Sequence, residues 1–223
     1  ENSVDYVFIL NNDTIVDKMA IFNLLKTSER NKNAGIIGPK IYFAPGFEYY
    51  KERYKEKERG KVIWYAGGQI DWKNLIFSHR GVDEVDMCQF NKSACTDYIS
   101  GCAMFIRKEV FSKVKLFDPR YFLYLEDVDL CERTRKAGFE IMFEPKALVW
   151  HKNASSTGNP GSKMHVYYQT RNRLIFGFSY SSWRTKIAIF RESLRMLFGS
   201  DSTQKKAVWD FYAGNLEKAG NLI

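Results

Sequence analysis

The sequence predicts an α/β fold, in which a sheet is flanked by helices, followed by a helical C-terminal extension. Two observations lead to this prediction. Up to about residue 150, short apolar runs without a helical period alternate with amphipathic helical patterns, and from Lys163 onward only helical patterns remain. We therefore divide the 223-residue chain into an α/β core, residues 1–150, and a basic helical extension, residues 151–223.

The elements of the core are predicted from apolar runs bounded by turn residues. The first run, Tyr6–Leu10, has five bulky residues and no polar alternation, which is typical of a strand buried on both faces of a parallel sheet. Asp17 is expected to cap a first helix whose buried face includes Ile21 and Leu24. Further strands are expected at residues 35–43, 62–66, 96–107, 139–143 and 147–150, and further helices at 108–114 and 126–136. Gly138 is expected to end the last of these helices.

The helical extension is predicted in three parts. Its pattern begins at Lys163 and is broken near residues 180–182 and again near residues 199–202. Its charge is also distinctive. Residues 146–223 contain 12 Lys and Arg against 4 Asp and Glu, whereas residues 1–145 contain 22 of each, so the whole net charge of +8 lies in this last third. Such a patch indicates an anionic partner, which is phosphate, nucleic acid or an acidic membrane surface.

Several classes of protein are disfavoured by composition. The four cysteines form no C-x-x-C pair and have no zinc-type spacing to histidine, so we interpret them as reduced thiols of a cytoplasmic protein. The longest uncharged stretch of the second half, residues 174–183, is shorter than the roughly 18 residues of a membrane-spanning helix. We expect a chain that does not cross a membrane but contacts its inner face. Nucleic acid is not an expected partner, because no recognition motif accompanies the basic residues.

Polar residues follow the first apolar run directly. Asn11, Asn12 and Asp13 come after Leu10. At the carboxyl end of a buried strand, such residues face the crevice in which open α/β sheets bind ligands. The same residues also suit a turn that leads into the helix near Asp17. These residues alone do not decide between a ligand-binding crevice and a turn.

Three acids begin the helix predicted at residues 126–136. Glu126, Asp127 and Asp129 complement the helix dipole, and this explanation needs no chemistry. The same position also favours the ionised form of a carboxylate, the form in which a general base takes a proton from an alcohol. The aromatic residues at 121, 122 and 124 suit either a packed core or a wall on which a sugar stacks.

A single histidine, His151, ends the last predicted strand. Most such histidines are ordinary surface or core residues. If His151 met Asp13 in space, one imidazole and one carboxylate would suit a divalent cation with positions left open for phosphate oxygens. On the helix that follows, Arg171 suits bidentate binding of phosphate or, equally, a solvated helix face.

Taken in order, five blocks of the chain resemble the family 2 glycosyltransferases, most closely the bacterial and archaeal rhamnosyltransferase-like members that build cell-surface polysaccharide. They are Leu-Asn-Asn-Asp-Thr after a strand, Ser-Gly-x-x-Met-x-x-Arg at 100–107, Leu-Phe-Asp-x-x-Tyr-Phe-x-Tyr-x-Glu-Asp-Val-Asp-Leu-Cys-x-Arg at 116–133, Pro-x-Ala-x-Val-x-His at 145–151 and Arg-Asn-Arg-Leu at 171–174. The resemblance covers nearly the whole chain. It implies a GT-A type fold, in which a sheet binds a nucleotide-diphosphate sugar.

By position, the resemblance implies a donor site around Asp13. This residue, with Asn11 and Asn12 before it, stands at the family's D-x-D motif and would contact the donor diphosphate and a divalent metal, Mn²⁺ or Mg²⁺. The first acid of the motif is Asn11 here, which is a weaker ligand. His151 matches the histidine that completes the metal site.

The resemblance also implies an acceptor site. Asp127 matches the base that deprotonates the acceptor hydroxyl, with Glu126 beside it, and Ser100 and Gly101 match the backbone that lines the acceptor pocket. The block that contains Arg171 and Asn172 is expected near the donor diphosphate.

Family members carry a nucleoside-binding segment before the D-x-D motif, and here only residues 1–4 precede the first strand. The resemblance therefore implies an N-terminally truncated chain without its nucleotide-base pocket. The activity that it implies is inverting transfer of a sugar from a nucleotide-diphosphate donor to a saccharide or lipid-linked acceptor.

The alternative to an enzyme is a truncated module that only binds carbohydrate or membrane. Binding of nucleotide with Mn²⁺ or Mg²⁺ distinguishes the enzyme from such a module. A nucleotidyltransferase is disfavoured, because the first strand lacks a basic Gly-rich loop.

The helical extension also suggests a membrane contact. Ile187, Phe190, Leu194 and Leu197 share one helical face, with Arg and Lys beside them, and this pattern suits a membrane interface. The alternative is that these apolar residues pack onto the α/β core while the basic side chains face solvent.

Overall fold

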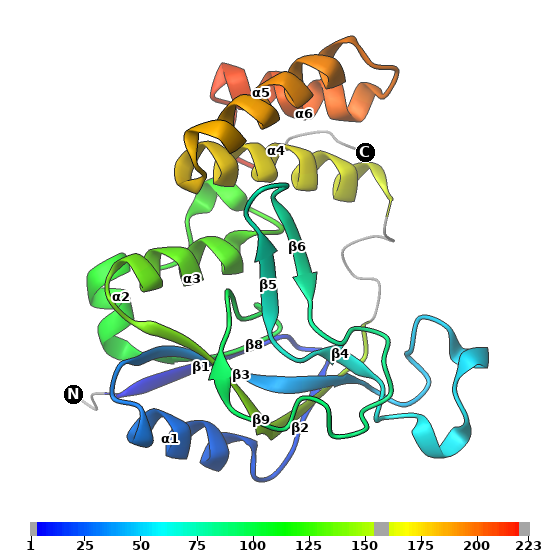
Figure 1. Cartoon of the computed structure of the whole chain (residues 1–223), viewed down its shortest axis with the longest axis vertical. Coiled ribbons are helices and arrows are strands. Elements are labelled where there is room, and N and C mark those ends of the chain that lie inside the picture. Colours follow the sequence, from blue (N-terminus) through cyan, green and yellow to red (C-terminus); the bar gives the residue numbers. More distant parts are fainter. Residues whose placement is uncertain (1–3, 154–160, 219–223) are drawn as a thin grey trace. The chain divides into compact units, whose positions relative to one another are not determined.

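The computed structural model describes residues 4–153 and 161–218. They form two compact units, which Figure 1 shows as ribbons. Unit 1 draws on residues 1–70, 77–116 and 130–154, and unit 2 on residues 71–76, 117–129 and 155–223. In the part of the chain that the structure describes, no helix has both the length and the apolar character needed to cross a membrane.

Unit 1 is built on a mixed β-sheet. Its strands lie in the order β1 (Tyr6–Leu10), β8 (Ala103–Arg107), β3 (Ala34–Phe43), β9 (Glu140–His151) and β2 (Thr14–Val16). Two short strands join at the sides: β4 (Ile63–Tyr65) pairs with β3, and β7 (Ala94–Cys95) pairs with β9. β3 and β9 are parallel to each other, and the other pairs are antiparallel.

The core of unit 1 lies around β3, all ten residues of which are buried. Helix α1 (Ala20–Arg30) packs against β3 and β9 (Figure 1). This helix begins three residues after Asp17, whose carboxylate accepts a hydrogen bond from Met19 N at 2.8 Å. The buried face of α1 consequently starts at Ala20, and Ile21 is 55% exposed, so its predicted place in the core is wrong.

The prediction that β1 is buried on both faces of a parallel sheet is also wrong. β1 pairs antiparallel with β8, its first four residues are half-buried, and Leu10 is exposed. Two aromatic side chains account for the apolar character of the strand, because Tyr6 and Phe8 pack against Phe105 and the cluster beneath α1. The run is therefore buried largely through one face.

The remaining elements are short. Helix α2 (Lys108–Val114) follows β8, and β5 (Gly68–Asp71) pairs with β6 (Ile76–His79) in a two-stranded sheet. Three 3₁₀ turns occur at Lys51–Arg53, Glu56–Glu58 and Pro119–Tyr121. Helix α3 (Glu126–Lys136) contributes its first four residues to unit 2 and the rest to unit 1, and the left-handed Gly138 follows its end.

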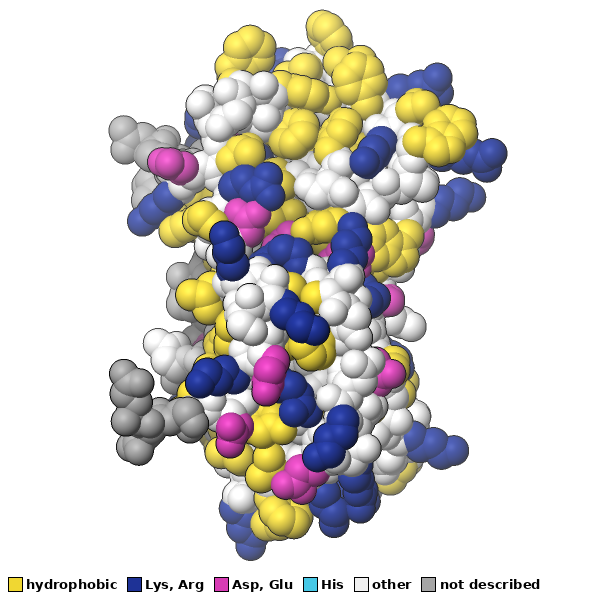
Figure 2. All heavy atoms as spheres, turned by 90° about the vertical axis from the view of Figure 1, so that its left-hand side faces the viewer, with side chains coloured by type: hydrophobic (Ala, Val, Ile, Leu, Met, Phe, Trp, Pro, Cys, Tyr) yellow, Lys and Arg dark blue, Asp and Glu magenta, His cyan; other side chains and the backbone are white. Residues whose placement is uncertain are grey.

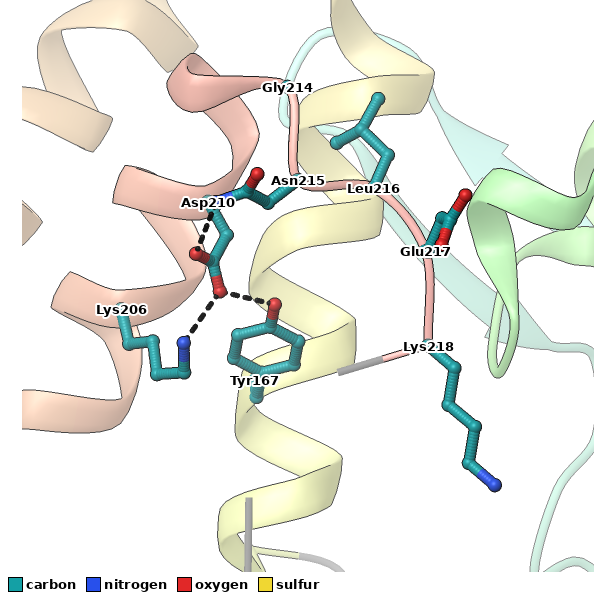
Figure 3. Close-up of a pocket in the computed structure, with 8 residues that line it drawn as sticks. All are labelled: Tyr167, Lys206, Asp210, Gly214, Asn215, Leu216, Glu217 and Lys218. Atoms are coloured by element: carbon teal, nitrogen blue, oxygen red, sulfur yellow. Dashed lines mark hydrogen bonds and ion pairs between the residues drawn. The ribbon is translucent and has the colours of Figure 1, made fainter. Parts of the chain in front are cut away.

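Unit 2 consists mainly of three helices that pack against one another, α4 (Lys163–Tyr180), α5 (Trp183–Phe198) and α6 (Ser202–Ala213) (Figure 1). Each begins at a side-chain cap, provided by Ser162, Ser182 and Asp201. The two breaks predicted near residues 180–182 and 199–202 are confirmed. Figure 3 shows one pocket of this unit, in which Asp210 accepts hydrogen bonds from Tyr167 and Lys206. The hydrogen bond from Tyr167 ties α6 to α4, and the one from Lys206 lies within α6.

Candidate functional site

The Asn11–Asp13 segment connects β1 to β2 and is held by backbone hydrogen bonds. Asn11 N donates to Cys102 O at 3.0 Å, and Lys152 N donates to Asp13 O at 2.9 Å. Asn11 and Asn12 are exposed, whereas Asp13 is half-buried. Because Thr14 faces His151 in the register of β2 and β9, Asp13 lies beside that histidine.

Asp13 and His151 meet in unit 1. His151 Nε2 lies 3.2 Å from Asp13 Oδ1, and the two side chains are 8% and 18% exposed, respectively. The approach is not aligned as a hydrogen bond, and Asp13 Oδ1 is a buried atom without a hydrogen-bond partner among the described residues. Burial lowers the pKa of His151, while the Asp13 carboxylate opposes this shift. The imidazole is therefore neutral near pH 7, the form in which histidine binds metals.

This pair fits a divalent cation. Two ligands that bind one ion at about 2.1 Å each, at right angles, lie about 3 Å apart, and the separation of Asp13 from His151 is close to this value. Among the described residues, no group of three or more His, Cys, Asp or Glu side chains is arranged to hold a metal ion. A cation at this pair would consequently take its other ligands from phosphate oxygens or water.

Trp64 orients the histidine. Its indole packs in T-shaped contacts with two imidazoles, with ring centroids 4.7 Å from His151 and 4.5 Å from His79. His79 Nδ1 lies 3.1 Å from Trp64 O, and burial lowers the pKa of His79 to about 4, so that imidazole is neutral as well. His151 Nδ1 is buried and has no hydrogen-bond partner in the described part of the chain, so ring packing takes the place of the hydrogen bond that commonly orients a metal-binding histidine. No motif marks Trp64 in the sequence.

Ser100 and Gly101 lie in the turn that leads into β8. Ser100 is 5% exposed, and its hydroxyl accepts a hydrogen bond from Cys102 N at 3.3 Å. The carbonyl of Cys102 in turn accepts the hydrogen bond from Asn11 N. The structure therefore brings this turn next to the Asn11–Asp13 segment. The place of Ser100 and Gly101 in an acceptor pocket stays a prediction.

The acid pair belongs to unit 2, at the first turn of α3. Asp127 Oδ1 accepts a hydrogen bond from Val128 N at 2.8 Å. Glu126 Oε2 is buried without a hydrogen-bond partner among the described residues. Burial, with the neighbouring Asp127 carboxylate as a second cause, raises the pKa of Glu126 to about 8. At neutral pH the pair therefore holds a proton on Glu126.

The segment before α3 has an unusual backbone. Tyr124 and Leu125 both have a φ of 66°, in the left-handed region that non-glycine residues rarely adopt. Asn172 on α4 holds this segment, because its amide nitrogen donates to the carbonyls of Tyr121, Leu123 and Tyr124 at 3.1, 2.7 and 2.8 Å. The sequence motif at residues 171–174 drew attention to Asn172 but did not predict these hydrogen bonds.

Arg171 is buried next to Asn172, and neither side chain is exposed to solvent. The Arg171 guanidinium donates to the carbonyls of Arg120 and Glu217 at 2.8 Å each and lies over the rings of Tyr167 and Tyr168. Every contact that the structure gives to Arg171 and Asn172 lies within unit 2. These contacts support a structural role in holding residues 120–124.

Comparison with known proteins identifies the family. The sequence profile of the family described as "Glycosyltransferase like family 2" matches residues 3–177. This chain belongs to that family. The match includes both the Asp13–His151 pair and the acid pair of α3.

Two curated relatives agree with the rhamnosyltransferase-like resemblance. The N-acetylglucosaminyl-diphospho-decaprenol L-rhamnosyltransferase of Mycobacterium tuberculosis (strain ATCC 25618 / H37Rv) is 28% identical over 180 residues, which cover 80% of this chain and 57% of that protein. Rhamnosyltransferase WbbL of Escherichia coli (strain K12) is 41% identical over 49 residues, or 22% of this chain and 19% of that protein. The chain thus spans little more than half the length of the mycobacterial relative.

A solved structure supports the fold. The crystal structure of GalNAc-T7 with UDP, GalNAc and Mn²⁺ superimposes with a TM-score of 0.56 at 16% sequence identity, covering 96% of this chain and 38% of that one. The predicted α/β fold of GT-A type is confirmed by this likeness.

Proposed function

We propose that this chain is the catalytic part of an inverting glycosyltransferase, which moves a sugar from a nucleotide-diphosphate donor to a saccharide or lipid-linked acceptor in cell-surface polysaccharide synthesis. Membership of family 2 supports sugar transfer. The observation that carries the proposal is the 3.2 Å approach of Asp13 to His151, residues from opposite ends of unit 1 in the sequence.

Asp13 and His151 would hold a divalent cation, Mn²⁺ or Mg²⁺, which when bound neutralises the charge of the donor diphosphate as it leaves. Asn11 and Asn12 present exposed amides beside them, suited to hydrogen bonds with phosphate or sugar oxygens. Arg171 and Asn172 would support the acceptor machinery through the backbone that they hold at residues 120–124, and the donor-diphosphate contact implied for them stays a prediction.

Asp127 is the proposed base. In the proposed reaction, the acceptor oxygen attacks the anomeric carbon from the face opposite the diphosphate, and its proton passes to the Asp127 carboxylate. The bond between the anomeric carbon and the phosphate oxygen breaks, and its electron pair leaves with the nucleoside diphosphate, so the anomeric configuration inverts. Glu126, whose pKa burial and the neighbouring Asp127 carboxylate raise to about 8, keeps its proton at neutral pH and so does not compete for the proton of the acceptor. Ser100 and Gly101 would line the acceptor pocket through their backbone.

The role of Asp127 is tested by Asp127→Asn, which keeps the size of the side chain and removes its ability to take a proton. We expect sugar transfer to fall by about 100-fold or more, the range for loss of a general base, while donor binding is unchanged. Release of nucleoside diphosphate from a panel of nucleotide-diphosphate sugars measures transfer. Asp201→Asn makes the same change at the N-cap of α6 and should leave transfer unaltered. Near-normal turnover of Asp127→Asn would overturn the assignment.

The role of the Asp13–His151 pair is tested by metal-dependent binding. Asp13→Asn and His151→Ala should each weaken binding of a nucleotide-diphosphate sugar in Mn²⁺ by about tenfold or more, the loss of one ligand, and should have little effect in EDTA. Calorimetry measures both affinities. Asp17→Asn is a matched control, since its carboxylate contacts the backbone before α1. Equal losses with and without Mn²⁺ would show that the pair acts without a metal.

The alternative is a module that binds carbohydrate or membrane and catalyses nothing. Donor binding in Mn²⁺ without any release of nucleoside diphosphate would favour a binding role. Release that depends on Asp127 would exclude it.

A further inference from the structure

Helix α5 carries its large apolar side chains on the outside. Its buried residues are Thr185, Ile189 and Ser193, two of which are small and polar. Its exposed apolar residues, which we call the α5 stripe, recur every three or four positions: Trp183, Ile187, Phe190, Leu194 and Phe198. This spacing places them along one face of the helix, away from the buried side. Phe198 is 88% exposed and Trp183 66% exposed.

Helix α6 extends this apolar surface. Trp209 is 67% and Tyr212 44% exposed, and the ring of Tyr212 lies 6.4 Å from that of Phe190. Figure 2 shows hydrophobic side chains gathered over these last two helices at the top of the view, with Lys and Arg side chains at the margin. Scattered exposed apolar residues are normal on a protein surface, but a contiguous aromatic patch marks an interaction site.

Basic residues flank the stripe. Each residue of a helix is rotated by 100° about the helix axis from the residue before it. This rotation places the exposed Arg184, Arg191 and Arg195 in a row along one side of the stripe and Lys186 on the other side. The single acidic residue of α5, Glu192, forms an ion pair with Arg173 of α4 at 2.9 Å. The margin of the stripe is therefore positively charged.

We propose that the α5 stripe is a membrane-binding surface, which inserts its aromatic and aliphatic side chains into the interface of a bilayer that contains anionic lipid. An apolar helix face with a row of arginines beside it, and with exposed Trp and Tyr, is the pattern of a helix that lies in such an interface. The proposal deepens the proposed function, because it supplies a surface at which a lipid-linked acceptor is met. It does not depend on catalysis.

Charge argues against a second copy of this chain as the occupant. A two-fold interface would place the α5 stripe of one copy on that of the other. With antiparallel helices the two rows of arginines meet, and with parallel helices each row meets Lys186 of the other copy, so basic margins come together in both cases. Like charges at an interface are unfavourable, whereas an anionic bilayer complements them.

The test is sedimentation of the 223-residue chain with vesicles of phosphatidylcholine that contain phosphatidylglycerol, at low salt. We expect the chain to sediment with these vesicles and less with phosphatidylcholine alone. Reversal of Arg184, Arg191 and Arg195 to Glu should weaken binding by on the order of 100-fold, since each basic residue near an anionic surface contributes about fivefold to affinity. Trp183→Ser with Phe198→Ser should weaken it at least tenfold, because both side chains leave the interface.

Matched controls come from α1 and the turn that follows it. Lys26, Arg30 and Lys32 are exposed, and their reversal to Glu makes the same change in net charge. Phe22 is 53% exposed, so Phe22→Ser removes an aromatic side chain from a surface of unit 1. Both controls should bind vesicles like the original chain. Loss of binding in them to the same extent, or absence of sedimentation at low salt, would overturn the proposal.

A second outcome would also overturn it. In that outcome the chain forms dimers without lipid, does not bind vesicles, and loses its dimers on Phe198→Ser. The α5 stripe would then be an interface between two copies of the chain. Release of nucleoside diphosphate in solution does not involve the stripe, so failure of vesicle binding and failure of the proposed transferase activity are separate results.

Discussion

The Asn172 side chain is a single amide that supports three backbone carbonyls. The segment that it holds includes Tyr124, and it ends at Leu125, where a second left-handed residue leads into the acid pair. Strained backbone of this kind persists where its surroundings hold it, and such positions are frequent at functional sites. The amide therefore links the packing of α4 to the placement of the first turn of α3.

We expect Asn172→Ala to lower the free energy of unfolding by about 3 kcal/mol, because one buried and two half-buried carbonyls lose their donor. Under conditions in which the variant is folded, kcat for sugar transfer should fall more than donor affinity. Urea unfolding and steady-state kinetics measure the two effects. Asn74→Ala, at an exposed position of unit 2, is the control. A variant that loses stability and keeps its kcat would show that Asn172 has no part in positioning the acids.

The raised pKa of Glu126 predicts how stability depends on pH. The folded chain keeps the proton of Glu126 up to about pH 8, whereas the unfolded chain releases it near 4.5. Between these values the folded state binds more protons, so the free energy of unfolding should decrease as pH rises. Glu126→Gln should remove this contribution, which is measured as a flatter pH profile of urea unfolding between pH 5 and 8.5. The same change at exposed Glu29 should leave the profile as it was.

At this scale, sequence reasoning placed some residues and missed others. Asp13 and His151 were expected to meet, because both follow apolar strands, and the structure brings them together. The burial of Arg171 between tyrosine rings was not expected, because a basic helical pattern predicts a solvated face and the rings come from tertiary packing. Trp64 lies far from both site residues in the sequence and carries no local signal.

Among the elements, β5 depends on a glycine. A Cβ atom at Gly68 would lie 2.4–2.6 Å from ring carbons of Tyr98, closer than packed atoms approach. We expect Gly68→Ala to lower the free energy of unfolding by about 1–3 kcal/mol, the usual cost of an extra methyl group in a packed core. Gln69→Ala, at the exposed neighbouring position of β5, should cost less. Guanidinium unfolding measures both, and equal stabilities would contradict this account of Gly68.

Helices were predicted better than strands. The bounds of α3 agree with the sequence because three acids mark its start and Gly138 follows its end, and the breaks before α5 and α6 carry side-chain caps. The strands β2, β5, β6 and β7 were missed, since two to four residues show no period. The predicted strand at residues 96–107 is confined to Ala103–Arg107, because the turn at Ser100 precedes it.

For the whole molecule, the order of the five blocks predicted the fold, because each block marks an element of one known architecture. Local sequence patterns do not predict how the two compact units are composed, because unit 2 is built from segments that are far apart in the sequence. Unit 2 incorporates residues 71–76 and 117–129 in addition to the C-terminal helices. These short segments are held by long-range contacts, such as the hydrogen bonds from Arg173 to the carbonyls of Asn74 and Leu75. The uneven charge of the chain, in turn, supports the proposed membrane surface.

The parallel pairing of β3 with β9 has a consequence for synthesis on the ribosome. β3 ends at Phe43, and its partner is complete only at His151. At the usual rates of translation, roughly 5–20 s pass between the two. During that time β3, which is buried along its whole length and is largely apolar apart from Lys40, lacks its parallel neighbour, so we expect the nascent chain to depend on chaperones or on rapid elongation. Synonymous changes that slow translation between residues 44 and 140 should therefore reduce the yield of folded protein without altering a single side chain.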